Sequence, residues 1–366
     1  MIGQTWLDDL KRKQGEQVFL DAMRDYATGE LQAAKRGVIL ARVLSIFVLA
    51  TPFLVAFWGV LLSVSTLPSW GGIVFGMLLV ATGYVLCPTR YRVPKEALSR
   101  DMAPILFAQL DEVSAALNAP KISHVVVTDD FNAFVTKQGG KTVLGVGALL
   151  WEAAPPDERV ALVAHEMAHL VNDDPARGKL MLYALQALEA WEDLLAPGPD
   201  GNVIADVALF PFRVLIAGLE QAVLRPMFLQ SQRAEYLADA LAAEVAGSDA
   251  VGRLLRTVSL GDGLQQEWNK LYGLGDAKGR GVVQRLSKCL HDMEETRRKS
   301  LLEKADKEKL SVDATHPPTA YRRAFVETVA SDGKQLRVSL VDDEDPAFLR
   351  RLDVIGERLA VVFDTQ

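Results

Sequence analysis

The chain has 366 residues, of which 49% are hydrophobic and 24% charged, and its formal net charge at pH 7 is -7. This acidic balance argues against a nucleic-acid-binding protein, because neutralising phosphates requires a basic face. Two cysteines, Cys87 and Cys289, are too few and too far apart for a disulfide framework, so the composition is compatible with a reducing compartment.

The segment from Val43 to Thr89 contains 47 consecutive residues without Asp, Glu, Lys or Arg. Two apolar stretches within it, Val43–Val64 and Trp70–Leu86, are near the length that crosses a hydrocarbon core of about 30 Å. Pro68, in the polar segment between them, cannot continue a helix. We therefore expect a transmembrane helical hairpin. The alternative, a buried hairpin in a large soluble core, is disfavoured because such cores rarely need so long a charge-free segment.

Basic residues flank both ends of the expected hairpin and are absent from its connecting loop. Those before it are Lys35, Arg36 and Arg42, and those after it are Arg90, Arg92, Lys95 and Arg100. The positive-inside rule places both ends in the cytoplasm. We expect an integral membrane protein of a bacterial inner membrane, with the rest of the chain cytoplasmic.

Between the hairpin and residue 171, the sequence predicts one helix, two strands and a second helix. They are a helix at Ala97–Leu117, strands at Ile122–Val127 and Thr142–Val146, and a helix that Pro155 and Pro156 open and that ends near Val171.

A third apolar stretch, Val203–Leu229, is interrupted by charges. They are Asp206, Arg213, Glu220 and Arg225. Each charge at mid-bilayer costs about 2.5 to 3.5 kcal/mol, so we do not expect an ordinary membrane span. Three of the four charges are spaced by seven and share one helical stripe. Two interpretations stay open: a core helix of the soluble domain interrupted at Pro211, which is favoured, and a helix that lies against the membrane.

After this stretch the sequence predicts a helix at Ser231–Ala246, a glycine-rich loop at Gly261–Gly281 and a charged helix at Gln284–Leu310. We expect four parts in the whole chain. They are an amphipathic cytoplasmic segment at 1–36, the hairpin at 37–90, a soluble domain at 91–331 and a helical tail at 332–366.

The helix that ends near Val171 carries the sequence His-Glu-Met-Ala-His from His165 to His169. The two histidines are four residues apart and project from one face, so both imidazoles can reach one Zn²⁺. Glu166 lies beside them, where it can accept a proton from water. A catalytic zinc site needs a third protein ligand. The strongest candidate is Glu235, which shares a helix face with Asp239; on a generic helix both carboxylates would face solvent instead.

These motifs resemble the gluzincin membrane metallopeptidases, which include the heat-shock protease HtpX and the CAAX prenyl proteases. The resemblance covers about Asn132 to Arg322. Its motifs are the turn Asn132-Ala133-Phe134 before the substrate-edge strand, which here is Lys141–Gly147, the zinc helix, Asp174, Glu235-Tyr236-x-Ala-Asp239, and Thr315-His316-Pro317-Pro318 followed by Arg322. The first 36 residues and the segment after about Asp332 match no part of that family.

The resemblance implies an α+β, mostly helical fold with a zincin-type metallopeptidase domain and one zinc ion per chain. It implies that His165, His169 and Glu235 bind zinc, that Glu166 is the general base and that Asp239 orients a ligand histidine. His316 either hydrogen-bonds the developing oxyanion or packs beneath a helix end. The implied substrate-binding residues are Asn132, Ala133, Phe134, Leu144 and Gly145.

The sequence therefore predicts a membrane-anchored zinc endopeptidase that cuts unfolded or membrane-associated polypeptides. Its expected partners are polypeptide substrates and the lipid bilayer but no nucleic acid, and an oligomer is compatible with the sequence. The alternative is a non-catalytic membrane-tethered scaffold with a structural zinc ion. One departure from the HtpX-like members is that they also have membrane helices between the zinc helix and the third ligand, where this chain has the charged stripe.

Overall fold

The computed structural model describes residues 2–31, 38–87, 93–138, 140–172, 179–196, 203–268, 278–306, 316–334, 336, 340 and 345–364. The chain divides into two compact units. The sheet unit consists of Met1–Ala33, Arg92–Asp174 and Gln232–Gln366, and the apolar-helix unit consists of Ala34–Tyr91 and Pro175–Ser231. The expected division into four parts stays a prediction. Lys35, Arg36, Arg90 and Arg92, on which the expected topology partly depends, lie outside the described residues.

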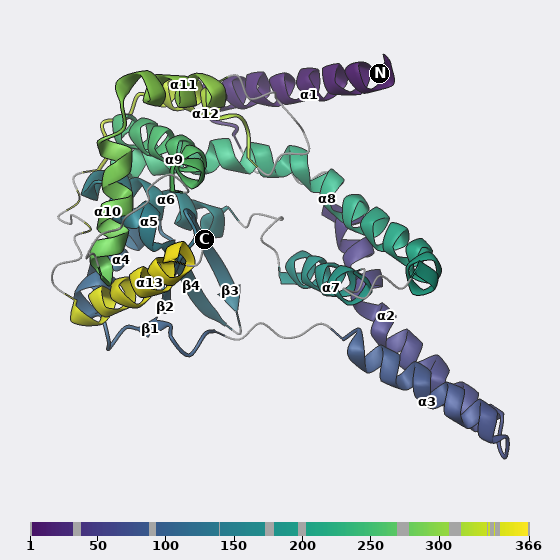
Figure 1. Ribbon diagram of the computed structural model, residues 1–366. Helices are drawn as coiled ribbons and strands as arrows, with labels where there is room; N and C mark the ends of the chain where they lie inside the picture. The colour runs from purple at the N-terminus through teal and green to yellow at the C-terminus, as the bar shows by residue number, and fades with distance from the viewer. Residues whose placement is uncertain are drawn as a thin grey trace. The chain divides into compact units, whose positions relative to one another are not determined.

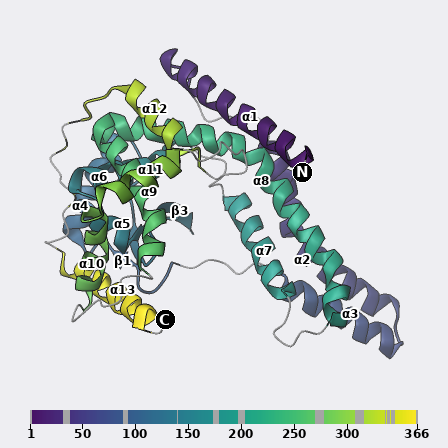
Figure 2. The same cartoon turned by 45° about the horizontal axis from the view of Figure 1, so that its top comes forward.

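The apolar-helix unit contains the expected hairpin. Helices α2 (Val38–Ser65) and α3 (Trp70–Val85) lie side by side (Figures 1 and 2). They approach so closely that a Cβ atom at Gly76 would lie 2.4 Å from the carbonyl oxygen of Gly59. Glycine at such positions lets two helix backbones pack without side chains between them, as is frequent in membrane helices.

Two further helical segments belong to this unit, α7 (Lys179–Leu195) and the first part of α8 (Val203–Ala246). Val48 of α2, Leu188 of α7 and Ile216 of α8 pack in one apolar cluster. The Trp191 indole donates a hydrogen bond of 2.8 Å to the carbonyl oxygen of Leu86. These contacts form a small three-helix core inside the unit.

Two helices of this unit are long and apolar enough to cross a membrane, at Ile39–Ser65 and Asp206–Leu224, and only 22% and 11% of their most apolar windows are buried. The favoured interpretation of the third apolar stretch, a core helix interrupted at Pro211, is therefore wrong. Helix α8 continues through Pro211, because a proline removes one backbone hydrogen bond and bends a helix without necessarily ending it.

Two of the charges in the third apolar stretch pair with each other. Arg213 Nη2 lies 2.9 Å from Asp206 Oδ1, and Arg213 Nε donates a hydrogen bond of 2.5 Å to the carbonyl oxygen of Leu195. Pairing of opposite charges and a satisfied guanidinium lower the cost of placing these groups in an apolar environment.

The sheet unit is built on four strands in the order β1-β2-β4-β3. They are β1 (Leu98–Ser99), β2 (His124–Thr128), β4 (Lys141–Gly147) and β3 (Ala133–Gln138). Strands β2 and β4 are parallel, and the outer pairs are antiparallel. The expected edge strand at Lys141–Gly147 is wrong, because β4 is paired on both sides. The edges of the sheet are β1 on one side and β3 on the other, and β3 begins inside the predicted Asn132-Ala133-Phe134 turn.

Strand β4 is internal because its side chains suit burial. Every residue from Thr142 to Gly147 is buried, in agreement with a sequence of almost unbroken apolar residues. Gly145 is paired with Phe134 of β3, and the Phe134 ring occupies the space of a side chain: a Cβ at Gly145 would lie 2.2 Å from that ring. The glycine thus permits the aromatic ring to cover the sheet.

Helices pack around this sheet and bury one large apolar cluster. They are α4 (Pro104–Ala116), α5 (Ala148–Ala153), α6 (Pro156–Val171), α9 (Ser248–Trp268), α10 (Arg280–His291), α12 (Thr319–Val329), α13 (Pro346–Asp364) and the last part of α8. Helices α1 (Ile2–Ala27) and α11 (Glu295–Asp306) pack in two smaller apolar clusters of the same unit. Helix α6 contacts both β3 and α9, and α13 contacts α10 and β2 (Figure 1). The predicted mostly helical α+β fold is confirmed.

Several predicted boundaries differ from the described ones. The helix predicted at Ala97–Leu117 is shorter in the structure. Helix α4 covers only Pro104–Ala116, and Leu98–Ser99 form strand β1. The predicted helix at Gln284–Leu310 is broken at residues 292–294, between α10 and α11. Helix α9 extends to Trp268, into the predicted glycine-rich loop, of which residues 269–277 lie outside the described part of the chain.

Candidate metal centre

Helix α6 carries the predicted His-Glu-x-x-His motif and begins where the sequence predicts. Pro156 stands in the first turn, where a missing backbone N–H costs nothing, and Asp157 and Glu158 place negative charge at the positive end of the helix. Every residue from Glu158 to His169 is buried. The motif is therefore held rigidly inside the sheet unit, with its polar side chains directed at protein groups and not at solvent.

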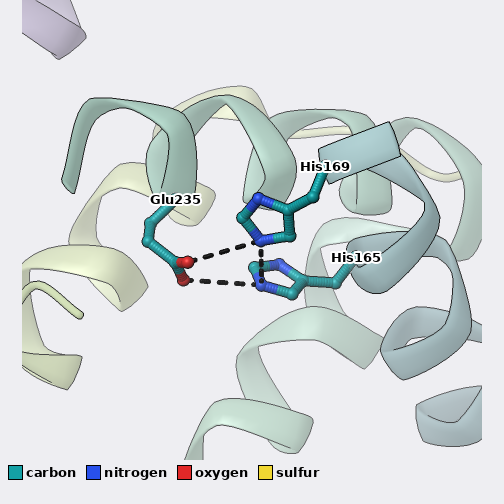
Figure 3. Close-up of side chains that lie close together, drawn as sticks. All are labelled: His165, His169 and Glu235. Atoms are coloured by element: carbon teal, nitrogen blue, oxygen red, sulfur yellow. Dashed lines mark hydrogen bonds and ion pairs between the residues drawn. The ribbon is translucent and has the colours of Figure 1, made fainter. Parts of the chain in front are cut away.

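The three predicted ligands meet at one point. Two imidazoles from α6 and one carboxylate from α8 face one another (Figure 3). His165 Nε2 lies 3.5 Å from Glu235 Oε2, His169 Nε2 lies 3.3 Å from Glu235 Oε1, and the two Nε2 atoms are 3.3 Å apart. One ligand atom from each residue lies within 4.8 Å of the others. The prediction that these residues come together is confirmed.

Asp239, one turn after Glu235 on α8, stands behind His165. Its Oδ1 lies 3.0 Å from His165 Nδ1, the ring nitrogen that faces away from the other ligands. Arg322 of α12 donates two hydrogen bonds to this carboxylate, from Nη2 to Oδ1 at 2.7 Å and from Nε to Oδ2 at 2.8 Å. A carboxylate in this place fixes the ring orientation and tautomer of a ligand histidine.

Arg322 also contacts the centre, although its place in the sequence motif predicts no role of its own for it. In addition to the two hydrogen bonds that Arg322 donates to Asp239, its Nη1 lies 3.4 Å from Glu235 Oε2. Its side chain is 13% exposed. The arginine thus joins the third-ligand helix to the segment that follows His316. Its spacing of six residues from His316 was the available signal, but spacing alone does not say which carboxylates a guanidinium reaches.

His316 lies at the mouth of the site. Its side chain is 54% exposed, and its Nδ1 lies 2.9 Å from Glu235 Oε2. The expected alternative, packing beneath a helix end, does not agree with this exposure. Thr315, the residue before it in the predicted motif, and Asp174 lie outside the described residues.

The charges of the centre stabilise one another. Burial raises the pKa of Glu235, but Arg322 and the two imidazoles outweigh it and hold this pKa well below its usual range. Burial lowers the pKa of His165, but Asp239 and Glu235 outweigh it and raise this pKa to about 9. The pKa of Asp239 is also lowered, because Arg322 and His165 outweigh its burial. Glu235 is therefore ionised, which is the form that binds a metal.

The donor atoms fit a zinc ion. Two imidazole nitrogens and one carboxylate oxygen form a ligand set typical of catalytic zinc, which leaves a position for water or substrate. Glu235 Oε2 is buried and accepts no hydrogen bond of normal geometry, although His316 and Arg322 lie near it. A buried carboxylate oxygen that lacks a donor is costly unless a cation satisfies it.

The remaining predicted site residues lie on neighbouring elements. Glu166 is buried on α6, directly after His165. Asn132 ends the loop before β3, and its Oδ1 accepts a hydrogen bond of 2.8 Å from the backbone N–H of Ala133. Leu144 and Gly145 are paired with β2 on one side and with β3 on the other. Their backbone groups therefore have no free edge to offer to a peptide.

Comparison with known proteins identifies the family. Neither a curated protein nor a solved structure matches the chain. The model of peptidase family M48 matches residues 103–330, which is more than half of the chain and contains the whole centre. The chain belongs to peptidase family M48, and the centre formed by His165, His169 and Glu235 is the zinc site of a metalloendopeptidase.

Proposed function

We propose that this protein is a membrane-anchored zinc endopeptidase that cuts unfolded or membrane-associated polypeptides at the cytoplasmic face, with Glu166 as general base. The observation that carries the proposal is the convergence of His165, His169 and Glu235 in a buried centre whose His165 is backed by Asp239. A purely structural zinc ion, as in the scaffold alternative, would be closed by four protein ligands. Among the described residues this centre offers three.

The proposed mechanism assigns one task to each side chain. When bound, zinc polarises the scissile carbonyl and acidifies a water molecule. Glu166 accepts a proton from the attacking water and later delivers it to the leaving amine, so that water adds across the broken C–N bond. His316, half exposed beside Glu235, donates a hydrogen bond to the oxygen of the scissile carbonyl as negative charge develops there. Asp239 holds His165 in its ligand orientation.

The edge strand β3 is the proposed substrate platform, in place of β4. Helix α6 contacts β3, so an extended peptide paired with this edge would run beside the zinc helix. Asn132, Ala133 and Phe134 stand at the start of that edge. Main-chain pairing gives affinity with little side-chain selectivity, which suits unfolded substrates. We assign Leu144 and Gly145 to support of β3, since the Phe134 ring packs over Gly145.

Membrane anchoring is proposed for the hairpin α2–α3 together with the first part of α8. Their large apolar side chains are exposed, and the basic residues of the sequence flank the hairpin. Cysteine labelling tests the topology. In a chain with Cys87 and Cys289 replaced by serine, Leu67→Cys should react with an impermeant reagent from outside, and Leu20→Cys and Asp130→Cys only from inside. Labelling of Asp130→Cys from outside would refute the cytoplasmic placement.

Replacement of the proposed base separates enzyme from scaffold. Glu166→Gln should lower the rate of casein cleavage by about 10² to 10⁴-fold, because it removes proton transfer, while zinc stays bound. The measurements are cleavage rate and zinc content of the purified full chain. Glu327→Gln, an exposed glutamate on α12, is the matched control and should change neither. Equal cleavage by Glu166→Gln and the wild type contradicts the assignment of the base.

A further inference from the structure

Helix α1, which the family resemblance does not cover, packs against the part of the sheet unit that carries the zinc site. Ala22 is fully buried, and Phe19, Met23 and Tyr26 are partly buried around it. Leu20, on the other face, is 52% exposed. The second half of α1 therefore buries one face against the sheet unit and exposes the other face.

The surface beneath α1 is made of residues next to the metal centre. The Phe19 ring lies 5.9 Å from the Tyr236 ring and 4.6 Å from the Tyr321 ring, between centroids. Tyr236 directly follows the ligand Glu235, and Tyr321 directly precedes Arg322, the partner of Asp239. One side chain of α1 thus contacts both helices whose charged residues build the centre.

A second contact, of a different kind, reaches the same helix. Asp25 of α1 forms an ion pair with Arg233, which precedes Glu235 by two residues on α8. The side chains of Asp25 and Arg233 are 15% and 19% exposed, so the pair is largely shielded from water. Charge pairs with little exposure are directional and less screened than surface pairs, so this one fixes α8 along and around its axis.

Successive residues of an α-helix point about 100° apart, so Tyr236 and Glu235 project from different sides of the same turn. A rotation or shift of α8 at its contact with α1 therefore moves the Glu235 carboxylate relative to the two imidazoles. Metal ligation depends on distances within a few tenths of an ångström. The contacts made by α1 lie where they can set those distances.

We propose that α1 is a positioning element of the zinc centre: Phe19, through Tyr236, and Asp25, through Arg233, hold the third-ligand helix where Glu235 completes the metal site. This inference rests on the zinc site described above. It assigns to the N-terminal segment a role in the reaction without contact between that segment and substrate or metal.

The first test compares two neighbouring residues on opposite faces of α1. In the full-length chain, Phe19→Ala should weaken zinc binding by about tenfold, the size expected when a ligand loses its support, whereas Leu20→Ala should leave it unchanged. The zinc dissociation constant is measured by competition with a chromogenic chelator, at a temperature where circular dichroism shows both variants folded. Phe19→Leu, which keeps apolar volume, should recover most of the affinity.

The second test uses the ion pair and does not depend on the first. Asp25→Arg and Arg233→Asp should each weaken zinc binding, and the double exchange should restore it, because the pair is rebuilt with its charges reversed. Wild-type zinc affinity in Phe19→Ala and in both single charge variants would overturn the proposal. Glu235→Ala distinguishes a failure of the ligand assignment from a failure of the proposal for α1. If Glu235→Ala also keeps its zinc, Glu235 is not a ligand, and the ligand assignment is the part that is wrong.

Discussion

Helix α6 and the segment Asp206–Leu224 of α8 are both rich in apolar residues and both carry charges. They differ in burial: most side chains of α6 are buried, whereas most side chains of the α8 segment are exposed. In α6 everything from Glu158 to His169 is buried, apolar and polar side chains alike. In the α8 segment only 11% of the apolar window is buried, and Phe210, Phe212 and Leu215 are more than half exposed.

The difference follows from the solvent that each segment requires. In water, apolar side chains must be covered by protein, and a charge inside is kept only where partners satisfy it, as at the zinc centre. In a bilayer, the environment proposed for the α8 segment, lipid covers the apolar side chains, and the charges must pair among themselves, as Arg213 does with Asp206. The distribution of exposed apolar residues therefore distinguishes these two segments better than the count of their charges does.

The largest expected effect comes from removing a buried charge from the zinc centre, which α6 forms together with the last part of α8. Glu235→Ala deletes one of three protein ligands, and we expect it to abolish casein cleavage and to lose most of the zinc. Asp239→Asn keeps all three ligands and should weaken zinc binding or activity by only about 10 to 100-fold. Metal analysis and cleavage rates of the two variants measure the contrast. An empty Asp239→Asn site beside a zinc-loaded Glu235→Ala site would reverse the assigned roles.

An intermediate effect is expected from the same substitution in the two environments. Met167 of α6 is fully buried, whereas Met77 of α3 is 63% exposed. Met167→Ala should lower the free energy of unfolding by about 2 to 5 kcal/mol, because it leaves a cavity in the core. Met77→Ala should change it by less than about 0.5 kcal/mol, since its side chain has few protein neighbours to lose. Thermal unfolding in detergent compares them, and equal losses would contradict the proposal that lipid covers α3.

The sequence predicts the metal centre well because its signal is local and chemical. Two histidines four residues apart on a helix share a face regardless of the rest of the fold, and Glu235 with Asp239 repeats that geometry. Helix α6 was also predicted with nearly its described bounds, since prolines open it and its apolar period is regular. Spacing could not predict the reach of Arg322, because its contacts to Asp239 and Glu235 depend on how α12 packs against α8.

The errors concern pairing and environment, which are not local. Nothing in Lys141–Gly147 says whether a strand has one neighbour or two, and an unbroken apolar run suits an internal strand better than an edge. The predicted turn Asn132-Ala133-Phe134 includes the first two residues of β3, because the pairing with β4 that makes this segment a strand cannot be read from its own residues. For the third apolar stretch, the sequence shows four charges but not the pairing of Arg213 with Asp206.

The smallest expected effect concerns Glu158, a buried charge on α6 away from the metal. Burial raises its pKa, although Thr257 Oγ1 donates a hydrogen bond of 2.8 Å to it and Arg253 lies nearby. A raised pKa means that the folded protein holds this proton at pH values where the unfolded chain has released it. The contribution of Glu158 to the free energy of unfolding therefore falls as the pH rises from about 4.5, its ordinary pKa, through its raised value in the fold.

Glu158→Gln removes this titration and keeps a group that can accept the hydrogen bond from Thr257. The difference in unfolding free energy, variant minus wild type, should therefore increase with pH across that window and then level off. Chemical denaturation at a series of pH values measures it, and the same series with Glu327→Gln should stay flat, because that side chain is exposed. A difference that falls with pH would mean that Thr257 and Arg253 stabilise the ionised carboxylate more than burial destabilises it. The buried charges of α6 would then all be compensated, those away from the metal as well as those beside it.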